Sequence, residues 1–432
     1  MIRRDFIKYS MISAAVLGST NLYSSIQVRT NKNIKTTVAI CGAGFAGLSC
    51  VKRLKELKPN LDVTVIEQNS SFSSCPFTNQ WLANVANIKF EDLNFSYNNS
   101  INKYKYNFIN AKVIDINKDK KIIFTSNQQI SYDYLIIAAG IDYDYKKIIK
   151  DINKIEECKL KAPAGLKAGK EHITLKNMVQ TFKGGNFIIS IPNGSYKCPP
   201  APYERACMIA TYFKTNNIKG KVIVLDPREK PAAKPHKFLK AFNKYYKNYI
   251  EYLPHSNFKD IDFEQKQITF EIFDKSILDY KIKKLQFEQA NIIPPNKANE
   301  LIEIAKLETL HGFAKLKEPT YQSISSDTIY VIGDAQGQYP FPKSAQMANS
   351  CAYILAEDLI SRIDNKKFNY KTNLPGNVCY SMITKTKAVS ITHEYSYKKD
   401  KLKVKAEVSD INKQTAQSAR AWYFGLTQDI LK

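Results

Sequence analysis

The 432-residue sequence lacks the cysteine and histidine patterns that usually hold metals and haem. Its eight cysteines form no Cys-x-x-Cys pair and no Cys-x-x-Cys-His motif, which argues against structural zinc and against c-type haem attached to this chain. Its five histidines include no close pair at ligand spacing. We therefore expect no metal centre.

Acidic residues are scarce, with 40 Asp and Glu against 64 Lys and Arg, a formal charge of +24. The lysines are spread along the chain and no nucleic-acid motif accompanies them, so nucleic acid is not the expected partner. A solvated basic surface or an acidic protein partner fits the charge better. Beyond the N-terminus no apolar run reaches transmembrane length, and the C-terminal tail lacks a sustained amphipathic face with a basic rim.

The N-terminal stretch "MIRRDFIK" places Arg3 and Arg4 before a short apolar segment. This pattern predicts a twin-arginine export signal over residues 1–30 and a periplasmic location. That route carries proteins already folded around a cofactor, which suggests a tightly held prosthetic group. An ordinary secretory signal and an uncleaved anchor are the alternatives.

A dinucleotide fingerprint follows. The run "TTVAIC" predicts a buried parallel strand, and "GAGFAG" comes directly after it, before an amphipathic helix and the strand "DVTVIE". We assign Gly42 to the tight turn, Gly44 to close approach of a pyrophosphate, and Gly47 to helix–strand packing. Glu67 is placed to accept hydrogen bonds from an adenosine ribose.

Two later strands end in residues suited to the same cofactor. One ends at Ala139 and Gly140, the other at Gly333 and Asp334, before a helix that starts after Pro342. Asp334 is placed to bind a ribityl hydroxyl, or else to cap a helix. Because the glycine fingerprint and these two strands recur together in flavoproteins with two dinucleotide domains, we predict FAD.

Residues between these segments show the strand–helix–strand order of a nicotinamide domain without its glycine turn. The segments are "GGNFIISIPNG", "YERACMIATYFKTN" and "KGKVIVLDP". Pro199, Pro200 and Pro202 stand in the loop and remove three N–H groups that could cradle phosphates. Nicotinamide binding is therefore not expected here.

The predicted fold class is α/β, with two Rossmann-like dinucleotide-binding-type domains and a C-terminal α+β interface domain. The FAD domain is split in sequence because its last strand lies far along the chain. The predicted ranges are 31–155 and 291–360 for the FAD domain, 156–290 for the second Rossmann-like domain, and 361–432 for the C-terminal domain.

Several stretches resemble the flavoprotein subunit of flavocytochrome c sulfide dehydrogenase, within the wider sulfide:quinone reductase and disulfide-reductase-like flavoproteins. They are "RRDFIK", "GAGFAG", "SSCPFTN", "KCPPAPYERA", "QANIIPPNKA", "VIGDAQGQYPFPKSAQMANS", "NVCYS" and "WYFGLTQDI", and they follow the family's order over nearly the whole chain. The resemblance implies an exported FAD-dependent sulfide dehydrogenase that pairs with a c-type cytochrome subunit as a heterodimer.

The resemblance also implies roles for three cysteines. It assigns Cys75 a covalent bond to the flavin, and Cys198 and Cys379 a redox disulfide beside it. A strained disulfide is open to attack by HS⁻, giving a persulfide on one sulfur and a thiolate on the other. The alternatives are a buried thiol at Cys75 and a structural disulfide between Cys198 and Cys379.

Three further side chains are candidates for the chemistry. Glu204, six residues after Cys198, is either a base that deprotonates H₂S or a helix-terminal charge stabilised by the dipole. Lys343 and Ser344 are placed to stabilise negative charge on the reduced flavin, or simply begin a helix. We assign no role to the other cysteines: Cys41 and Cys50 belong to the core, Cys207 and Cys351 to helices, and Cys158 to a lysine-rich loop.

Two other functions stay open. One is a periplasm-facing sulfide:quinone oxidoreductase of the same superfamily, against which the missing amphipathic tail counts. The other is a non-catalytic flavoprotein subunit of a sulfur-oxidising complex, which would hold flavin that sulfide cannot bleach.

Overall fold

A computed structural model describes residues 36–337, 340–399 and 401–432 of the chain. The export signal predicted over residues 1–30 lies outside the described residues. Within the described ranges, no helix is both long enough and apolar enough to cross a membrane.

The first sheet forms around the strand predicted before the glycine motif. Short β-branched runs favour strands that are covered on both faces, and β1 is buried almost throughout. All neighbouring strands run parallel, and the edge strand β21 comes from the C-terminal third of the chain. In spatial order the strands are β21 (Ile329–Val331), β9 (Tyr134–Ile137), β1 (Thr37–Cys41), β2 (Asp62–Glu67) and β5 (Asn107–Asn110).

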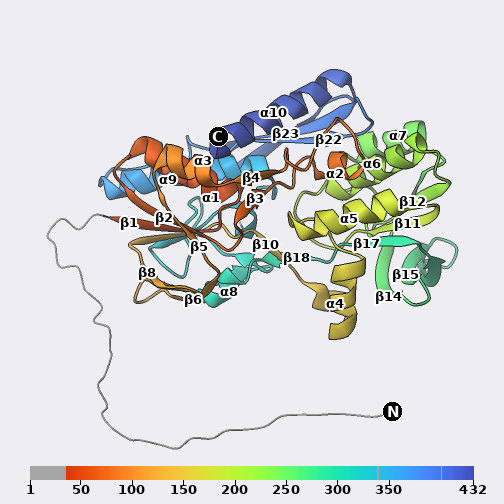
Figure 1. The fold of residues 1–432 in the computed structure, drawn as a ribbon, viewed down its shortest axis with the longest axis horizontal. Coiled ribbons are helices and arrows are strands. Elements are labelled where there is room, and N and C mark those ends of the chain that lie inside the picture. The colour runs from red at the N-terminus through yellow and green to blue at the C-terminus, as the bar shows by residue number, and fades with distance from the viewer. Residues whose placement is uncertain (1–35, 338–339, 400) are drawn as a thin grey trace, which may run out of the picture. The chain divides into compact units, whose positions relative to one another are not determined.

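A second parallel sheet follows in the middle of the chain. Helices connect its first three strands in chain order, and a three-stranded antiparallel sheet leads to the fourth. Two parallel sheets linked in this way confirm the predicted α/β class (Figure 1). The exact domain boundaries stay a prediction. The strands are β13 (Ile250–Leu253), β12 (Gly220–Leu225), β11 (Gly185–Ser190) and β17 (Gln289–Ile292), with connecting helices α6 (Ala201–Thr215) and α7 (Pro235–Tyr245).

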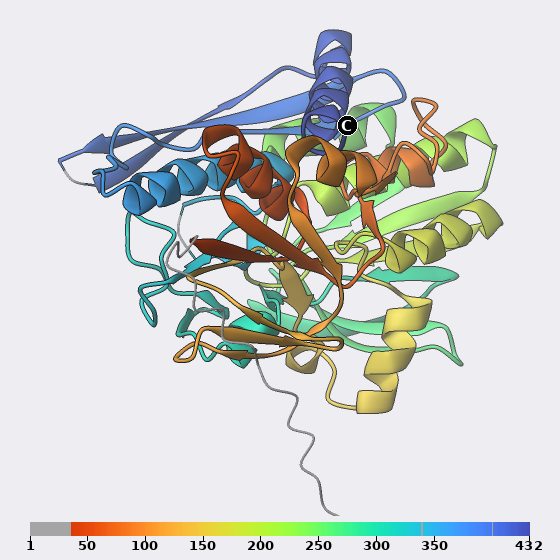
Figure 2. The same cartoon turned by 60° about the vertical axis from the view of Figure 1, so that its left-hand side comes forward.

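The C-terminal residues form an antiparallel sheet followed by a long helix, as their alternating pattern indicates. The helix α10 (Lys413–Leu431) packs on β22 (Asn377–Met382) and β23 (Ala388–Lys398), and both views show it lying over α1 (Figures 1 and 2). The third strand is β24 (Lys401–Val408). This sheet matters for the site because β22 carries Cys379.

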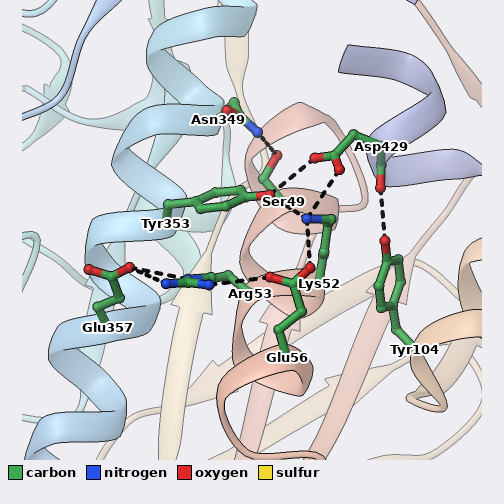
Figure 3. A network of polar contacts seen from close by, with 9 residues as sticks. All are labelled: Ser49, Lys52, Arg53, Glu56, Tyr104, Asn349, Tyr353, Glu357 and Asp429. Atoms are coloured by element: carbon green, nitrogen blue, oxygen red, sulfur yellow. Dashed lines mark hydrogen bonds and ion pairs between the residues drawn. The ribbon is translucent and has the colours of Figure 1, made fainter. Parts of the chain in front are cut away.

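Polar contacts bind the C-terminal helix to the first Rossmann unit (Figure 3). The buried ammonium of Lys52, on α1 (Phe45–Leu57), donates to the hydroxyl of Tyr353 at 2.6 Å. It also pairs with Glu56 at 2.7 Å and with Asp429 of α10 at 3.2 Å. Since Tyr353 belongs to α9 (Ala345–Ile363), one cation links three helices.

The remaining elements are short and surround the two parallel sheets. Cys158 is fully buried on a helix, α4, and not in the loop predicted for it, because its apolar side chain packs in the second core. The helices are α2 (Thr78–Leu82), α3 (Asn98–Tyr104), α4 (Ile152–Lys161), α5 (Lys170–Thr181) and α8 (Leu301–Ile304), with 3₁₀ turns at Tyr145–Lys147 and Gly333–Ala335. Antiparallel partners are β3 (Ser71–Ser73) with β4 (Asn94–Ser96); β6 (Val113–Asn117), β7 (Ile122–Thr125) and β8 (Gln129–Ser131); β10 (Ile141–Tyr143) with β18 (Asn296–Ala298); β14 (Ser256–Asp262), β15 (Gln267–Asp274) and β16 (Asp279–Gln286); and β19 (Thr309–Leu310) with β20 (Phe313–Ala314).

Candidate functional site

A cavity of about 360 Å³ lies where the strands of the first sheet, the start of α6 and strand β22 meet. Most of the residues singled out in the sequence line it, although they come from distant parts of the chain. The exceptions are Gly47 and Lys343. The lining residues among them are Gly42, Gly44, Glu67, Cys75, Ala139, Gly140, Cys198, Glu204, Gly333, Asp334, Ser344 and Cys379.

The glycine motif forms the turn its spacing predicts. Gly42 has φ +105°, and a Cβ there would lie 2.7 Å from the Ala138 carbonyl oxygen. A Cβ on Gly47 would lie 1.9 Å from the Gly42 carbonyl oxygen, so this glycine lets α1 pack on the turn. Gly44 faces open space, with no described atom within 4 Å of the position that a Cβ would take. The turn therefore leaves a backbone surface that a pyrophosphate can approach.

The carboxylate of Glu67 is fixed beside this turn. Its Oε2 accepts from the Ala43 N–H at 2.9 Å, and its Oε1 accepts from the backbone and side-chain amides of Asn69 at 2.9 and 2.7 Å. An ionised carboxylate offers about four acceptor sites, so capacity remains for a hydroxyl donor. The predicted contact with a ribose is therefore compatible with this geometry.

Asp334 carries an orphaned acceptor. Its Oδ2 pairs with the ammonium of Lys197 at 3.1 Å, while its buried Oδ1 has no hydrogen-bond partner among the described residues. Burial opposes the charge on Lys197, but the neighbouring Cys75 and Asp334 outweigh it and raise the pKa of this lysine. Asp334 caps no helix, since the side chain of Ser344 caps α9. Asp334 is among the residues that line the cavity, and its unpaired oxygen is an acceptor that no described residue satisfies.

Lys343 and Ser344 directly precede α9, which fits the alternative that they begin a helix. Lys343 is not among the lining residues, and its ammonium donates to the carbonyl oxygens of Asp334 and Gln336 at 2.9 and 2.7 Å. Burial lowers its pKa to about 8. The Ser344 Oγ lines the cavity but accepts from the Met347 N–H at 3.1 Å, so it begins α9. The predicted role of both residues in stabilising negative charge on the reduced flavin stays a prediction.

Cys198 and Cys379 meet at the cavity wall as two free thiols in mutual hydrogen-bonding contact. That contact, with burial, raises the pKa of Cys198. The same contact lowers the pKa of Cys379, and the ammonium of Lys234 acts in the same direction. The two cysteines are far apart in sequence, so the fold itself brings them together.

The loop at Cys198 is held in an uncommon conformation. Cys198 has φ +51°, in the left-handed region, directly before Pro199 and Pro200. Its N–H donates to the Lys343 carbonyl at 2.9 Å, and its carbonyl accepts from the Ala201 N–H at 2.8 Å. A non-glycine residue in this region costs of order 1 kcal/mol, which the surrounding bonds must offset. These two backbone bonds hold Cys198 in this conformation at the cavity wall.

Glu204 lies in the first turn of α6, buried beside the sulfur pair. Its carboxylate accepts from Asn79 Nδ2 at 2.9 Å, Gln80 Nε2 at 3.0 Å and the Met382 N–H at 2.7 Å. Burial raises its pKa, although Asn79 and Met382 oppose the shift. A carboxyl with a raised pKa next to thiols is suited to proton exchange. The helix-dipole alternative is also satisfied by this position.

Cys75 lines the cavity between the first Rossmann unit and the loop before α5. Its Sγ donates to the Leu166 carbonyl oxygen at 3.3 Å. Burial raises the pKa of the thiol, while Lys197 works against that shift. Its place in the wall is compatible with attachment to a bound flavin, and the covalent link stays a prediction.

Four cationic or imidazole side chains around the cavity were not anticipated, and all except the half-buried Lys197 are buried. The guanidinium of Arg205 donates to Asn79 Oδ1 at 3.1 Å and to Asn291 Oδ1 at 2.7 Å. Burial lowers the pKa of His172 to about 3, so this imidazole is neutral. Lys197 and Arg205 are next in sequence to the predicted residues Cys198 and Glu204, so the sequence could have indicated them. His172 and Lys234 carry no motif, and only the fold shows them.

In the second sheet, protein side chains bond to one another where a nicotinamide domain would have its phosphate loop. Asp226, at the end of β12, is completely buried and accepts from the hydroxyls of Tyr203 and Tyr252 at 2.5 and 3.0 Å. Arg228 donates to Asp226 at 3.1 Å and to the carbonyl oxygen of Gly194 at 2.8 Å. The acid that could otherwise receive a ribose is therefore engaged within the protein.

Three family models match the chain. Residues 36–159 match the pyridine nucleotide-disulphide oxidoreductase model. Residues 172–284 match the central part of the sulfide dehydrogenase [flavocytochrome c] flavoprotein chain, and residues 374–431 match the flavocytochrome c sulphide dehydrogenase flavin-binding model. The second Rossmann unit and the C-terminal sheet thus carry the family-specific matches.

Curated relatives include sulfide:quinone oxidoreductases. The mitochondrial enzyme of Mus musculus is 24% identical over 78% of this chain and 74% of its own length. The mitochondrial enzyme of Schizosaccharomyces pombe is 24% identical over 59% of this chain, which spans 55% of that enzyme. The sulfide-quinone reductase of Aquifex aeolicus is 32% identical over 43% of this chain and 41% of its own length.

Solved structures agree on the fold. The sulfide:quinone oxidoreductase from Aquifex aeolicus superimposes with a TM-score of 0.73 at 19% identity, over 91% of each chain. A putidaredoxin reductase complex gives 0.65 at 12% identity, over 90% of this chain and 93% of that one. Fold and cavity define an FAD-binding flavoprotein of the disulfide oxidoreductase class.

Within that class, the chain is similar to the flavocytochrome c sulfide dehydrogenase flavoproteins, whose models match residues 172–284 and 374–431, and to the sulfide:quinone reductases. Its cofactor is FAD. The open face of Gly44 and the orphaned oxygen of Asp334 fit this dinucleotide, because they offer a phosphate surface and a hydroxyl acceptor. When bound, FAD supplies a two-electron acceptor that can release electrons singly.

Proposed function

We propose that this chain is an exported sulfide dehydrogenase flavoprotein that passes electrons to a c-type cytochrome subunit in the periplasm. The observation that carries the proposal is the contact of Cys198 and Cys379 in the wall of the cofactor cavity. A disulfide that only stabilised the fold could lie anywhere in a protein core. A thiol pair beside a flavin site is instead suited to exchange electrons with the flavin.

The proposed chemistry starts from the oxidised pair. HS⁻ attacks one sulfur of the Cys198–Cys379 disulfide, so the S–S bond breaks, a Cys–S–SH persulfide forms, and the other sulfur leaves with the electron pair as a thiolate. Glu204 accepts the persulfide proton. The S–S bond of the persulfide then breaks and zero-valent sulfur leaves, while the Cys198–Cys379 bond forms again and two electrons are given up. FAD bound in the cavity would supply the acceptor for that electron pair. For each HS⁻ consumed, one proton and two electrons leave the site.

The surrounding residues have separate tasks in this scheme. Two backbone bonds keep Cys198 at the cavity wall. Glu204, held by three donors and with a raised pKa, accepts the persulfide proton and then releases it from the site. Lys197 and Asp334 neutralise each other beside the cofactor cavity rather than leaving an isolated buried charge.

The variant Cys379→Ser tests the assignment. We expect it to retain FAD but to lose reduction of the flavin by sulfide, because no disulfide remains to be opened. The measurement is flavin absorbance after anaerobic addition of sulfide, with Cys207→Ser as control, since that cysteine is buried on α6. Unchanged bleaching in Cys379→Ser would refute the redox pair.

Sulfide:quinone oxidoreduction is the second candidate, favoured by the names of the aligned relatives. Acceptor assays separate the two functions. Sulfide-dependent reduction of a c-type cytochrome without quinone supports our proposal, whereas reduction of a short-chain quinone alone supports the second candidate.

A further inference from the structure

A buried cation lies beside the sulfur pair, on the side away from the cofactor cavity. Lys234 is only 2% exposed and does not line the cavity. It precedes Pro235, the first residue of α7, and has φ +51°. Its carbonyl accepts from the Phe238 N–H at 3.1 Å, so the start of the helix holds its backbone in place.

The side chain of Lys234 reaches the strand that carries Cys379. Its ammonium donates to Ser381 Oγ at 2.8 Å. Residues two apart on a strand share a face, so Ser381 and Cys379 lie on the same face of β22. The hydroxyl therefore holds the Lys234 ammonium beside the strand that carries the sulfur. Burial lowers the pKa of Lys234, and negative charge on Cys379, Glu204 or Cys198 opposes that shift.

The charged and titratable side chains around the sulfur pair come from several elements. The sulfur pair faces Lys234 and, from α6, the carboxyl of Glu204. Burial lowers the pKa of His393, on β23, and the charge of Lys234 lowers it further. This imidazole therefore adds no positive charge at neutral pH. No carboxylate pairs directly with Lys234 among the described residues. A buried ammonium without an ion-pair partner is costly unless nearby negative charge develops.

We propose that Lys234, oriented by Ser381, is a positioning residue that stabilises the thiolate released when the Cys198–Cys379 disulfide opens. This inference rests on the proposed function for its biological meaning. When HS⁻ breaks the S–S bond, one sulfur departs with the electron pair, and the ammonium on the far side of the pair balances that charge. A better stabilised thiolate is a better leaving group.

The thiols can be titrated without sulfide turnover. The flavin-loaded protein is reduced with dithiothreitol under argon and desalted, and the rates at which iodoacetamide alkylates Cys198 and Cys379 are measured by peptide mass spectrometry from pH 5.5 to 9.5. The pKa of Cys379 is lowered to about 7. We expect Lys234→Met to raise the apparent pKa of the more reactive thiol by about one unit, so that its alkylation rate at pH 7 falls about fivefold. Ser381→Ala should shift it in the same direction by less.

Lys237→Met is the matched control. Lys237 lies on the same helix and pairs with the exposed Asp410 at 2.6 Å, so its loss should leave the profile unchanged. An unchanged profile in a folded, flavin-retaining Lys234→Met protein would overturn the proposal. If Lys234→Met does not fold, Ser381→Ala decides, and an unshifted profile there overturns it. A protein that fails to oxidise sulfide yet shows the expected shifts refutes the proposed function alone.

Discussion

At the scale of single residues, the chemistry of the site depends on the few polar groups that have no hydrogen-bond partner among the residues that the structure describes. Most polar atoms around the cavity bond within the protein, as Glu67 and Glu204 do. Asp334 Oδ1, Gln80 Oε1 and His172 Nδ1 are exceptions, and all three residues line the cofactor cavity. Polar groups without a partner in one cavity are suited to bind a ligand.

The covalent attachment at Cys75 is testable at this scale. We expect FAD of the native protein to remain with the polypeptide after acid precipitation, and FAD of Cys75→Ala to be released into the supernatant, because the thioether is the only covalent tether proposed. Flavin fluorescence of the two fractions is the measurement. Release of the flavin from the native protein would show that the covalent link is wrong.

At the scale of elements, the cavity exists because several segments end at one place. The sequence patterns predict β1, α1, β9 and β21 from local features, since buried parallel strands and a glycine turn leave strong signals. The same patterns cannot show that the ammonium of Lys343 donates to backbone carbonyl oxygens or that Lys234 approaches Cys379. Those positions follow from helix packing and from left-handed backbone before proline, which local periodicity does not encode.

At the same scale, the contacts of Lys52 join the helices α1, α9 and α10 (Figure 3). We expect Lys52→Met to lower the free energy of unfolding by about 1–2 kcal/mol, since three charge-assisted contacts are lost while the freed carboxylates remain partly hydrated. Urea unfolding measures this difference. Lys58→Met, which removes the exposed pair with Asp364, should change stability by less than about 0.5 kcal/mol. Equal effects in the two variants would contradict a structural role for the Lys52 contacts.

At the scale of the whole molecule, the chain combines a cofactor cavity with a net charge of +24. Ion pairs are numerous on its surface, but lysines outnumber their acidic partners. Such a surface attracts an acidic protein over several ångströms and is screened by salt. The charge therefore bears on association with an electron acceptor and not on the fold.

This argument predicts the salt dependence of electron transfer. The second-order rate of reduction of an acidic c-type cytochrome should fall on the order of tenfold as ionic strength rises from about 0.01 M to about 0.2 M. Stopped-flow absorbance of the haem measures it, with a basic cytochrome c as control, for which salt should not slow the reaction. A rate for the acidic cytochrome that is independent of salt would contradict electrostatic docking.

The central claim is that sulfide reduces the flavin through the Cys198–Cys379 pair. The most direct test is an anaerobic titration of the purified, flavin-loaded protein with sulfide, followed at the visible absorbance maximum of the flavin. We predict bleaching at stoichiometric sulfide and no response to NADH, since the loop after β11 contains prolines and Asp226 is engaged by tyrosines. Reduction by NADH with no response to sulfide would contradict the account and assign a nicotinamide to the second Rossmann unit.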